Sequence, residues 1–219
     1  MEILQFVNDE HVSSIDNIFR WGMARTIKDE NIAGHSWWVV MFSYLIANEF
    51  YLGESTSKNS LLLKVMVKAQ THDLDEIFSD DVSHDVKYNE FNGEQLKESI
   101  STYTSKMLNK KFQGMDGLLE AVKHTADTEF EEVIFAIVKL ADWLACIKYV
   151  VAEVSMGNKS MESKLAKCVN KLSNHIDYTA GILDSNPMIE GFDRGFLMVM
   201  KSDLVYFYND FWKNGKYSN

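Results

Sequence analysis

The chain has 219 residues, with 32 Asp and Glu against 22 Lys and Arg, and a net charge of −10 at pH 7. This acidic balance argues against a nucleic-acid polymer as partner, because such binding needs clustered basic residues, but a small nucleotide remains compatible with it. No 18 consecutive apolar residues occur, the N-terminus lacks the pattern of a signal peptide, and Cys146 and Cys168 are too few for a disulfide framework. We therefore expect a cytoplasmic protein without a membrane partner.

Apolar residues recur at three- and four-residue spacing without sustained alternation, and Pro187 is the only proline, which predicts an all-α fold of seven or eight helices. We expect the polar run Gly53–Ser60 to be a loop. The long polar stretch Asp75–Gly93 is typical of a functional loop. The expected helices are His11–Arg20, Gly34–Leu52, Leu61–His72, Gly93–Asn109, Asp116–His124, Phe130–Ser155, Lys159–Leu183 and Glu190–Lys213.

A chain of this length can bury a sizeable core as one domain. We expect residues 1–219 to form a single domain, with a motif-bearing core at about 11–156 and additional C-terminal helices at about 159–213. The large apolar side chains of the helices are expected to pack in that core, and these include Trp37, Met41, Met66 and Met198.

Four residues lie on apolar helix faces, where burying a charged or titratable side chain without a partner costs free energy. Asp142 follows Ile134 and Val138 at four-residue steps, and an ionised carboxylate that is buried there needs a cation or a strong donor. His35 lies at the start of one expected helix, and His72-Asp73 at the end of another. A single histidine or aspartate of this kind can equally be an ordinary core residue that forms hydrogen bonds. Together, the four favour a site for a divalent cation.

Each of two further residues has two possible interpretations. Glu76 lies four residues after His72, so a continued helix would place its carboxylate beside the metal as a general acid, base or water-orienting group. It could instead be an ordinary exposed residue at a helix end. His124 is either a ligand for a second metal or a histidine at a helix C-terminus, where the helix dipole favours it.

The order of His35, His72-Asp73 and Asp142 resembles the HD-domain phosphohydrolase superfamily, and the closer resemblance is to the YfbR-like 5′-deoxynucleotidases. Each matching segment is similar to one of that family's motifs: the Arg-Trp pair fourteen residues before the first metal histidine, the segment around that histidine, HDxxE, the D…VKY loop and KxAD. These segments are Arg20-Trp21, Glu30–Ser36, His72–Glu76, Asp81 with Val86–Tyr88, and Lys139–Asp142. Departures from the pattern are Gly34 in place of a glutamate, Asp80 in place of a small residue, and His84-Asp85 in place of Thr-Pro.

The resemblance implies an HD-domain helical core and hydrolysis of 2′-deoxynucleoside 5′-monophosphates with one divalent metal ion. Histidine and carboxylate ligands suit Co, Mn, Fe or Zn better than Mg. The resemblance also points to a homodimer. The implied roles are metal binding by His35, His72, Asp73 and Asp142, catalysis by Glu76 and Asp81, and substrate binding by Arg20 at the phosphate, Trp21 at the sugar against a 2′-hydroxyl, and Lys87.

Two other functions share this pattern. A triphosphohydrolase that acts on deoxynucleoside triphosphates would use the same metal site, and the altered loop around His84-Asp85 leaves the number of phosphates open. A nucleotide-binding or regulatory module could keep the HD fold without catalysis, although such a module has no need of Glu76 beside a complete set of metal ligands.

Overall fold

The computed structural model describes residues 14–22, 24–79, 82, 92–123, 125–186 and 189–215. Within these residues the chain forms helices joined by short connections, with two isolated β-bridges and no strand, so the all-α prediction is confirmed. None of their helices is long and apolar enough to cross a membrane. The elements are η1 (Ile15–Asn17), α3 (Ile32–Phe50), α4 (Ser55–Thr71), α5 (Glu76–Ser79), α7 (Gly93–Lys111), α8 (Asp116–Val122), α9 (Glu129–Ser155), η2 (Lys159–Met161), α10 (Glu162–Ser185), α11 (Arg194–Asp210) and η3 (Phe211–Gly215).

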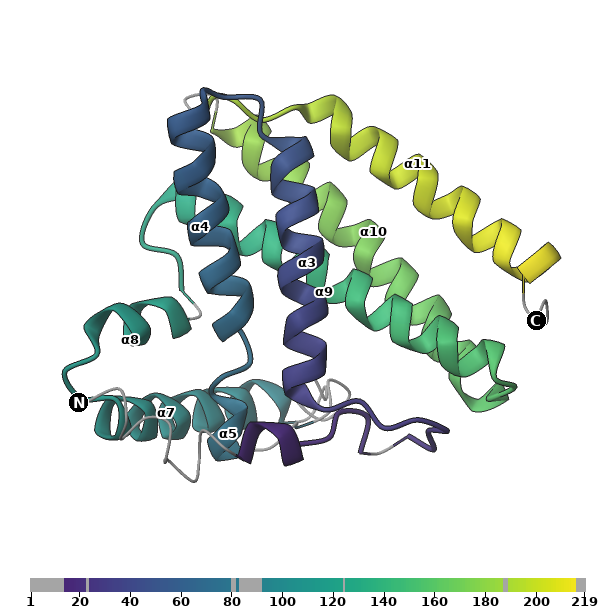
Figure 1. Ribbon diagram of the computed structural model, residues 1–219, viewed down its shortest axis with the longest axis horizontal. Coiled ribbons are helices and arrows are strands. Elements are labelled where there is room, and N and C mark those ends of the chain that lie inside the picture. The colour runs from purple at the N-terminus through teal and green to yellow at the C-terminus, as the bar shows by residue number, and fades with distance from the viewer. Residues whose placement is uncertain are drawn as a thin grey trace.

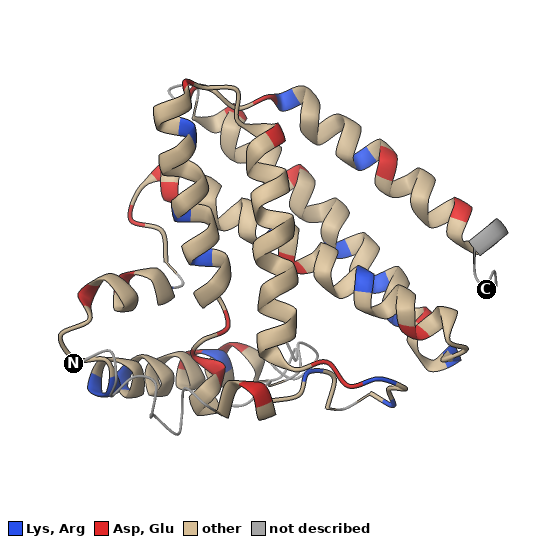
Figure 2. Ribbon diagram, viewed as in Figure 1, with Lys and Arg blue, Asp and Glu red and all other residues tan. Residues whose placement is uncertain are grey.

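The long helix α9 is the centre of the packing. It contacts α3, α4 and α10, and it is buried along most of its length (Figure 1). Helices α3 and α4 lie side by side in front of it and form one helical hairpin. Figure 2 shows α3 almost without charge, because Glu49 is its only Asp, Glu, Lys or Arg. A helix of this composition is stable only when neighbouring helices cover much of it, and this burial brings its N-terminal turn against α9.

A second apolar cluster lies at the base of the hairpin (Figure 1). It joins the segment after η1 to α5, α7, α8 and the first residue of α3. Ile18 and Ile77 belong to it, so the cluster fixes the chain two residues before Arg20 and directly after Glu76. Its buried members are Ile18, Ile32, Ile77, Leu108, Phe112 and Val122.

Local capping sets where the two ligand-bearing helices begin. The Asn31 side chain accepts a hydrogen bond from the backbone N–H of Gly34 at 2.8 Å, which starts α3 one turn before His35. Thr128 caps α9 by accepting from the N–H of Glu131, while the Glu131 carboxylate accepts from the N–H of Asp127. Acidic residues in the first turn of α9 also stabilise the helix, because they interact favourably with the positive end of its dipole.

The predicted loop Gly53–Ser60 is wrong, because α4 already begins at Ser55. Its first two turns are polar and mostly exposed, so they carry no apolar periodicity that could reveal a helix. The predicted helix His11–Arg20 extends too far: Ser14 is helical and the 3-10 turn Ile15–Asn17 follows it, but the backbone is no longer helical from Ile18 to Arg20. There the backbone pairs with a distant segment instead: Arg20 N donates to Glu30 O at 2.8 Å, and Ile32 N donates to Ile18 O at 3.0 Å.

Smaller corrections concern helix ends and the core. The polar stretch Asp75–Gly93 contains α5, and most of the remainder lies outside the described residues. The last predicted helix starts at Arg194, where Asp193 caps it, rather than at Glu190. Four side chains predicted to be in the core are exposed, because they lie on the outer faces of α3, α4 and α11: Trp37, Met41, Met66 and Met198.

Candidate metal centre

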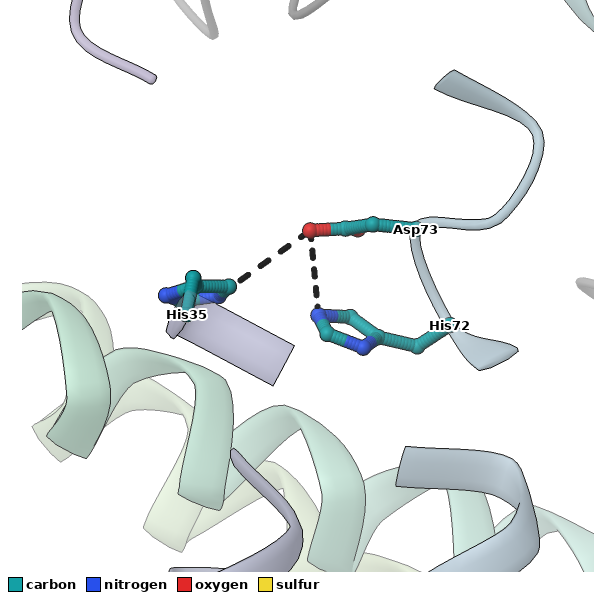
Figure 3. Close-up of side chains that lie close together, drawn as sticks. All are labelled: His35, His72 and Asp73. Atoms are coloured by element: carbon teal, nitrogen blue, oxygen red, sulfur yellow. Dashed lines mark ion pairs between the residues drawn. The ribbon is translucent and has the colours of Figure 1, made fainter. Parts of the chain in front are cut away.

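The four predicted ligands come together from three separate parts of the fold. His35 lies in the first turns of α3, His72 and Asp73 form the turn after α4, and Asp142 lies in the middle of α9. Ligand atoms of His35, His72 and Asp73 lie within 4.8 Å of one another, and His35 forms a second such group with Asp142 and Cys146. Figure 3 shows the Asp73 carboxylate turned toward both imidazoles.

His35 is fully buried and is held by carboxylates on both sides. Its Nε2 lies 3.0 Å from Asp142 Oδ1 and 3.9 Å from Asp73 Oδ2, and its Nδ1 lies 4.0 Å from Glu30 Oε1. Burial and the positive charge of Arg20 lower the pKa of His35 to about 4. The imidazole is therefore neutral near pH 7, which is the form that can bind a cation.

His72 has one nitrogen fixed by the backbone and the other directed at the site. Its Nδ1 lies 2.7 Å from the carbonyl oxygen of Ala69, and because a carbonyl can only accept, Nδ1 carries hydrogen. The buried Nε2 makes no hydrogen bond of good geometry, although Asp73 Oδ2 lies 3.1 Å away. Burial opposes a charge on His72, but the Asp73 carboxylate outweighs it and raises the pKa of the imidazole. A cation would satisfy both groups in place of that second proton.

Asp73 and Asp142 are both ionised although both are removed from water. Burial would raise the pKa of Asp73, but His72 and Arg20 hold it far below its usual range. The same holds for the pKa of Asp142, where Lys139, His35 and Arg20 outweigh burial. Two carboxylates and two imidazoles lie close together here, and Arg20 and Lys139 form ion pairs with the carboxylates. This donor set fits one divalent transition-metal ion.

Arg20 links the two carboxylates of the cluster. One terminal nitrogen donates to Asp73 Oδ2 at 2.7 Å, and the other lies 4.0 Å from Asp142 Oδ1 and 3.6 Å from Cys146 Sγ. Its Nε lies 3.9 Å from Glu30 Oε2. The guanidinium is therefore placed beside the ligands, where it can meet an anionic group that approaches the metal.

Trp21, the neighbour of Arg20, has a fixed position. Its backbone adopts a left-handed conformation with φ of 66°, which is costly for a bulky residue and persists only when the surroundings enforce it. Its indole N–H donates to Glu30 Oε2 at 3.0 Å, and its ring stacks on Tyr149 at a centroid distance of 5.5 Å. The indole therefore presents a rigid surface next to Arg20.

Glu76 is buried, but not through the helix continuation that the sequence suggested. Helix α4 ends at Thr71, a turn follows, and Glu76 begins the short helix α5, with its N–H donating to Asp73 O at 3.1 Å. The interpretation of Glu76 as an ordinary exposed residue is wrong, since only 6% of it is accessible. Burial would lower the pKa of Arg20, but Cys146, Asp73, Asp142 and, to a smaller extent, Glu76 raise it. Predictions for Asp81, Lys87, His124 and the pair His84-Asp85 lie outside the described residues.

Three residues at the site had not been singled out from the sequence. Glu30 accepts from Trp21 and lies near Arg20 and His35. Lys139 places its Nζ 2.5 Å from Asp142 Oδ2, and Cys146 places its Sγ 3.8 Å from Asp142 Oδ1. The spacing of the last two relative to Asp142, three before and four after, is the signal that could have found them, because it places all three on one face of a helix.

Comparison with known proteins identifies the family. The family model for YfbR-like 5′-deoxynucleotidases matches residues 8–181. The chain belongs to the YfbR-like family. The 5′-deoxynucleotidase PM0747 of Pasteurella multocida is 30% identical over 159 residues, which cover 68% of this chain and 74% of that protein. The 5′-deoxynucleotidase YfbR of Salmonella arizonae is 31% identical over 166 residues, which cover 72% of this chain and 76% of that protein.

A solved structure supports the same fold for this YfbR-like chain. An HD-domain phosphohydrolase from Listeria innocua superposes with a TM-score of 0.63 at 18% sequence identity, covering 98% of this chain and 92% of that one. The HD fold predicted from the order of His35, His72-Asp73 and Asp142 is therefore confirmed. A divalent metal agrees with the donor set assembled here.

Proposed function

We propose that this protein is a metal-dependent hydrolase that removes the 5′-phosphate from 2′-deoxynucleoside 5′-monophosphates. The observation that carries the proposal is the clustering of two imidazoles and two ionised carboxylates, in two groups that share His35, with one guanidinium beside them. A buried group of this kind has no role in packing, and relatives named 5′-deoxynucleotidases share the family. The site residues below are part of the same proposal.

His35, His72, Asp73 and Asp142 would hold one divalent ion. Their donors are Nε2 of each histidine, Oδ2 of Asp73 and Oδ1 of Asp142, the atoms that lie nearest to one another. Mixed nitrogen and oxygen donors favour Mn, Fe, Co or Zn over Mg. The chemistry supplied by such an ion is acidification of a water molecule and neutralisation of charge on a phosphate oxygen.

Arg20 would hold the phosphate, because it is always protonated and lies beside the ligands rather than among them. As charge develops on the phosphoryl oxygens, a guanidinium already in place stabilises it without reorganisation. Glu76 would position the attacking water or take its proton, since its carboxylate is buried near Arg20 at the end of the ligand-bearing turn. Asp81 and Lys87 complete the proposed set, as a second acid and a phosphate-side cation.

Preference for deoxynucleotides would come from Trp21. The indole is fixed by Glu30 on its N–H and by Tyr149 on its face, so it cannot move aside to admit a 2′-hydroxyl. A ring that also leaves such a hydroxyl without a hydrogen-bond partner penalises ribonucleotides further.

A nucleotide panel tests the function directly. Purified protein supplied with Co²⁺ or Mn²⁺ is expected to release inorganic phosphate from deoxynucleoside monophosphates and to be much less active on the matching ribonucleotides. Release of triphosphate from deoxynucleoside triphosphates would instead establish the triphosphohydrolase alternative. Absence of turnover on both, with tight nucleotide binding, would establish the silent regulatory module. A preference for ribonucleotides would contradict the role given to Trp21.

Two substitutions separate metal binding from catalysis. Asp142→Ala is expected to abolish metal retention and turnover together, because a ligand is lost. Glu76→Gln is expected to retain the metal while kcat falls by about 10²- to 10⁴-fold, the usual contribution of a general acid or base. Metal content by elemental analysis, measured beside kcat, checks both. Full activity of Asp142→Ala under limiting metal would refute the site.

A further inference from the structure

Cys146 lies against the metal centre, although the metal-binding motifs do not include it. It sits on α9 one helical turn after Asp142 and is 3% accessible. Its Sγ lies 3.8 Å from Asp142 Oδ1 and 3.6 Å from a terminal nitrogen of Arg20. Residues four apart on a helix face the same direction, so the backbone of α9, rather than a chance rotamer, brings the sulfur to Asp142.

The sulfur is one of three donor atoms that lie close enough together to bind one metal ion. One donor each from His35, Asp142 and Cys146 lies within 4.8 Å of the other two. His35 is also part of the group with His72 and Asp73 that Figure 3 shows, so the two groups share one imidazole. A cation bound by His35 is therefore within reach of sulfur as well as of oxygen.

A second, independent observation points to a cation at this place. The Nε2 atom of His72 is buried without a hydrogen bond, while Nδ1 of the same ring is committed to Ala69 O. The two imidazole rings lie 5.6 Å apart, centroid to centroid. Imidazoles whose outer nitrogen is held by the backbone commonly present the other nitrogen to a metal. The centre thus has a nitrogen donor available to a cation, and Cys146 lies beside Asp142 in the group that shares His35 with it.

We propose that Cys146 is a fifth donor of this centre and gives it a preference for thiophilic divalent cations, Zn²⁺, Co²⁺ and Fe²⁺, over Mn²⁺ and Mg²⁺. A bond forms between Sγ and the cation as the S–H bond breaks, and the proton passes to solvent, so no oxidant or reductant is required. Thiolate is a soft ligand that Zn²⁺, Co²⁺ and Fe²⁺ accept and that Mg²⁺ and Mn²⁺ disfavour. The proposal rests on the metal site proposed above, but not on the nucleotide substrate.

Spectroscopy of the cobalt-loaded protein tests this sulfur bond. The full-length protein is stripped of metal and titrated with Co²⁺ as wild type, Cys146→Ser and Cys146→Ala, with Cys168→Ala as the matched control for the other buried cysteine. We expect a sulfur-to-cobalt charge-transfer band in the near ultraviolet for wild type and Cys168→Ala, and none for either Cys146 variant. Retention of helical circular dichroism establishes that the variants are folded, and serine and alanine differ little in size from cysteine.

Competition between metals provides the second readout. We expect the ratio of Zn²⁺ to Mn²⁺ affinity to fall by about tenfold or more in Cys146→Ala, the scale on which changes around a metal site alter affinity. Cobalt binding to wild type without the band, together with an unchanged affinity ratio in Cys146→Ala, would overturn the proposal.

The proposed substrate and the proposed metal site can be refuted independently of each other. A sulfur–cobalt band in a protein that hydrolyses no deoxynucleotide would support the role of Cys146 and refute the proposed function alone. Undiminished cobalt binding by Asp142→Ala would refute the metal site and this inference with it.

Discussion

At the scale of single residues, the site is organised by the balance of charge around Asp142. One carboxylate oxygen, Oδ1, faces His35 and Cys146, while the other, Oδ2, is held by Lys139. Lys139 reaches Oδ2 from the surface, with 47% of its side chain accessible. The lysine therefore fixes the rotation of the carboxylate, so that Oδ1 is the oxygen that faces His35.

We expect Lys139→Gln to weaken metal binding by about 10- to 100-fold, as changes of groups that orient ligands usually do. Lys139→Arg should retain most of the affinity, because it keeps the charge near Oδ2. Calorimetric titration with Mn²⁺ measures both variants. A competing effect is repulsion between the ammonium and the cation, and tighter binding in Lys139→Gln would show that this repulsion outweighs the orientation of Asp142.

At the scale of elements, α9 holds the segment that carries Arg20 and Trp21. The Glu153 carboxylate, fully buried, accepts from the backbone N–H groups of Ile27 and Lys28 at 2.7 and 2.8 Å and from the Asn158 amide at 2.7 Å. Tyr149, one turn earlier, donates to Lys28 O at 2.5 Å and stacks on Trp21. A segment without regular structure is thus fastened at several points to the helix that also carries Asp142.

We expect Glu153→Ala to release this segment and lower the unfolding free energy by about 2–4 kcal/mol, because two backbone N–H groups and the Asn158 amide lose the buried carboxylate that accepts from them. Arg20 and Trp21 would lose their fixed positions, so KM should rise while the affinity for metal stays nearly unchanged. Hydrogen exchange at Ile27 and Lys28, measured beside KM, checks the physical cause. Glu153→Gln keeps one acceptor oxygen and should be intermediate. A large loss of metal affinity would show instead that the substitution disturbs α9 itself.

At the scale of the whole molecule, a bound metal should stabilise the fold, because its ligands come from α3, the turn after α4, and α9. Metal at about 100 times its Kd contributes about 2.7 kcal/mol, which for a chain of this size raises Tm by roughly 5–10 °C. Differential scanning calorimetry with and without Co²⁺ measures the shift. Asp142→Ala serves as the control and should show almost none. An equal shift in that variant would indicate that the metal binds elsewhere.

The prediction of a homodimer also belongs to this scale. The outer faces of α3 and α11 expose large apolar side chains, among them Trp37 at 53% and Tyr206 at 73% accessibility. Trp37 was predicted to be in the core because it is a large apolar side chain in a helix, and such a residue type does not by itself distinguish a buried face from an exposed one. Light scattering at several protein concentrations would decide whether a second copy of the chain covers these faces.

The sequence by itself determined the all-α class, most of the helices and the four proposed metal ligands. The ligands were recognisable because charged and titratable groups on apolar helix faces are too costly to keep without a partner. Spacing from His72 indicated Glu76, and family motifs added roles for Arg20 and Trp21. Periodicity failed at the polar first turns of α4, at the end of the first predicted helix and at the start of the last one.

Only the tertiary structure decided which groups meet. The carboxylate of Glu30, the ammonium of Lys139 and the sulfur of Cys146 surround the same centre as His35, and Glu76 reaches its buried position through a break after α4 rather than through a longer helix. The physical reason is that periodicity reports the direction of a side chain from its own helix. Contacts between elements far apart in the sequence depend on how those helices pack, and it is packing that brings Asp142 and Cys146, neighbours on α9, against His35 and Arg20.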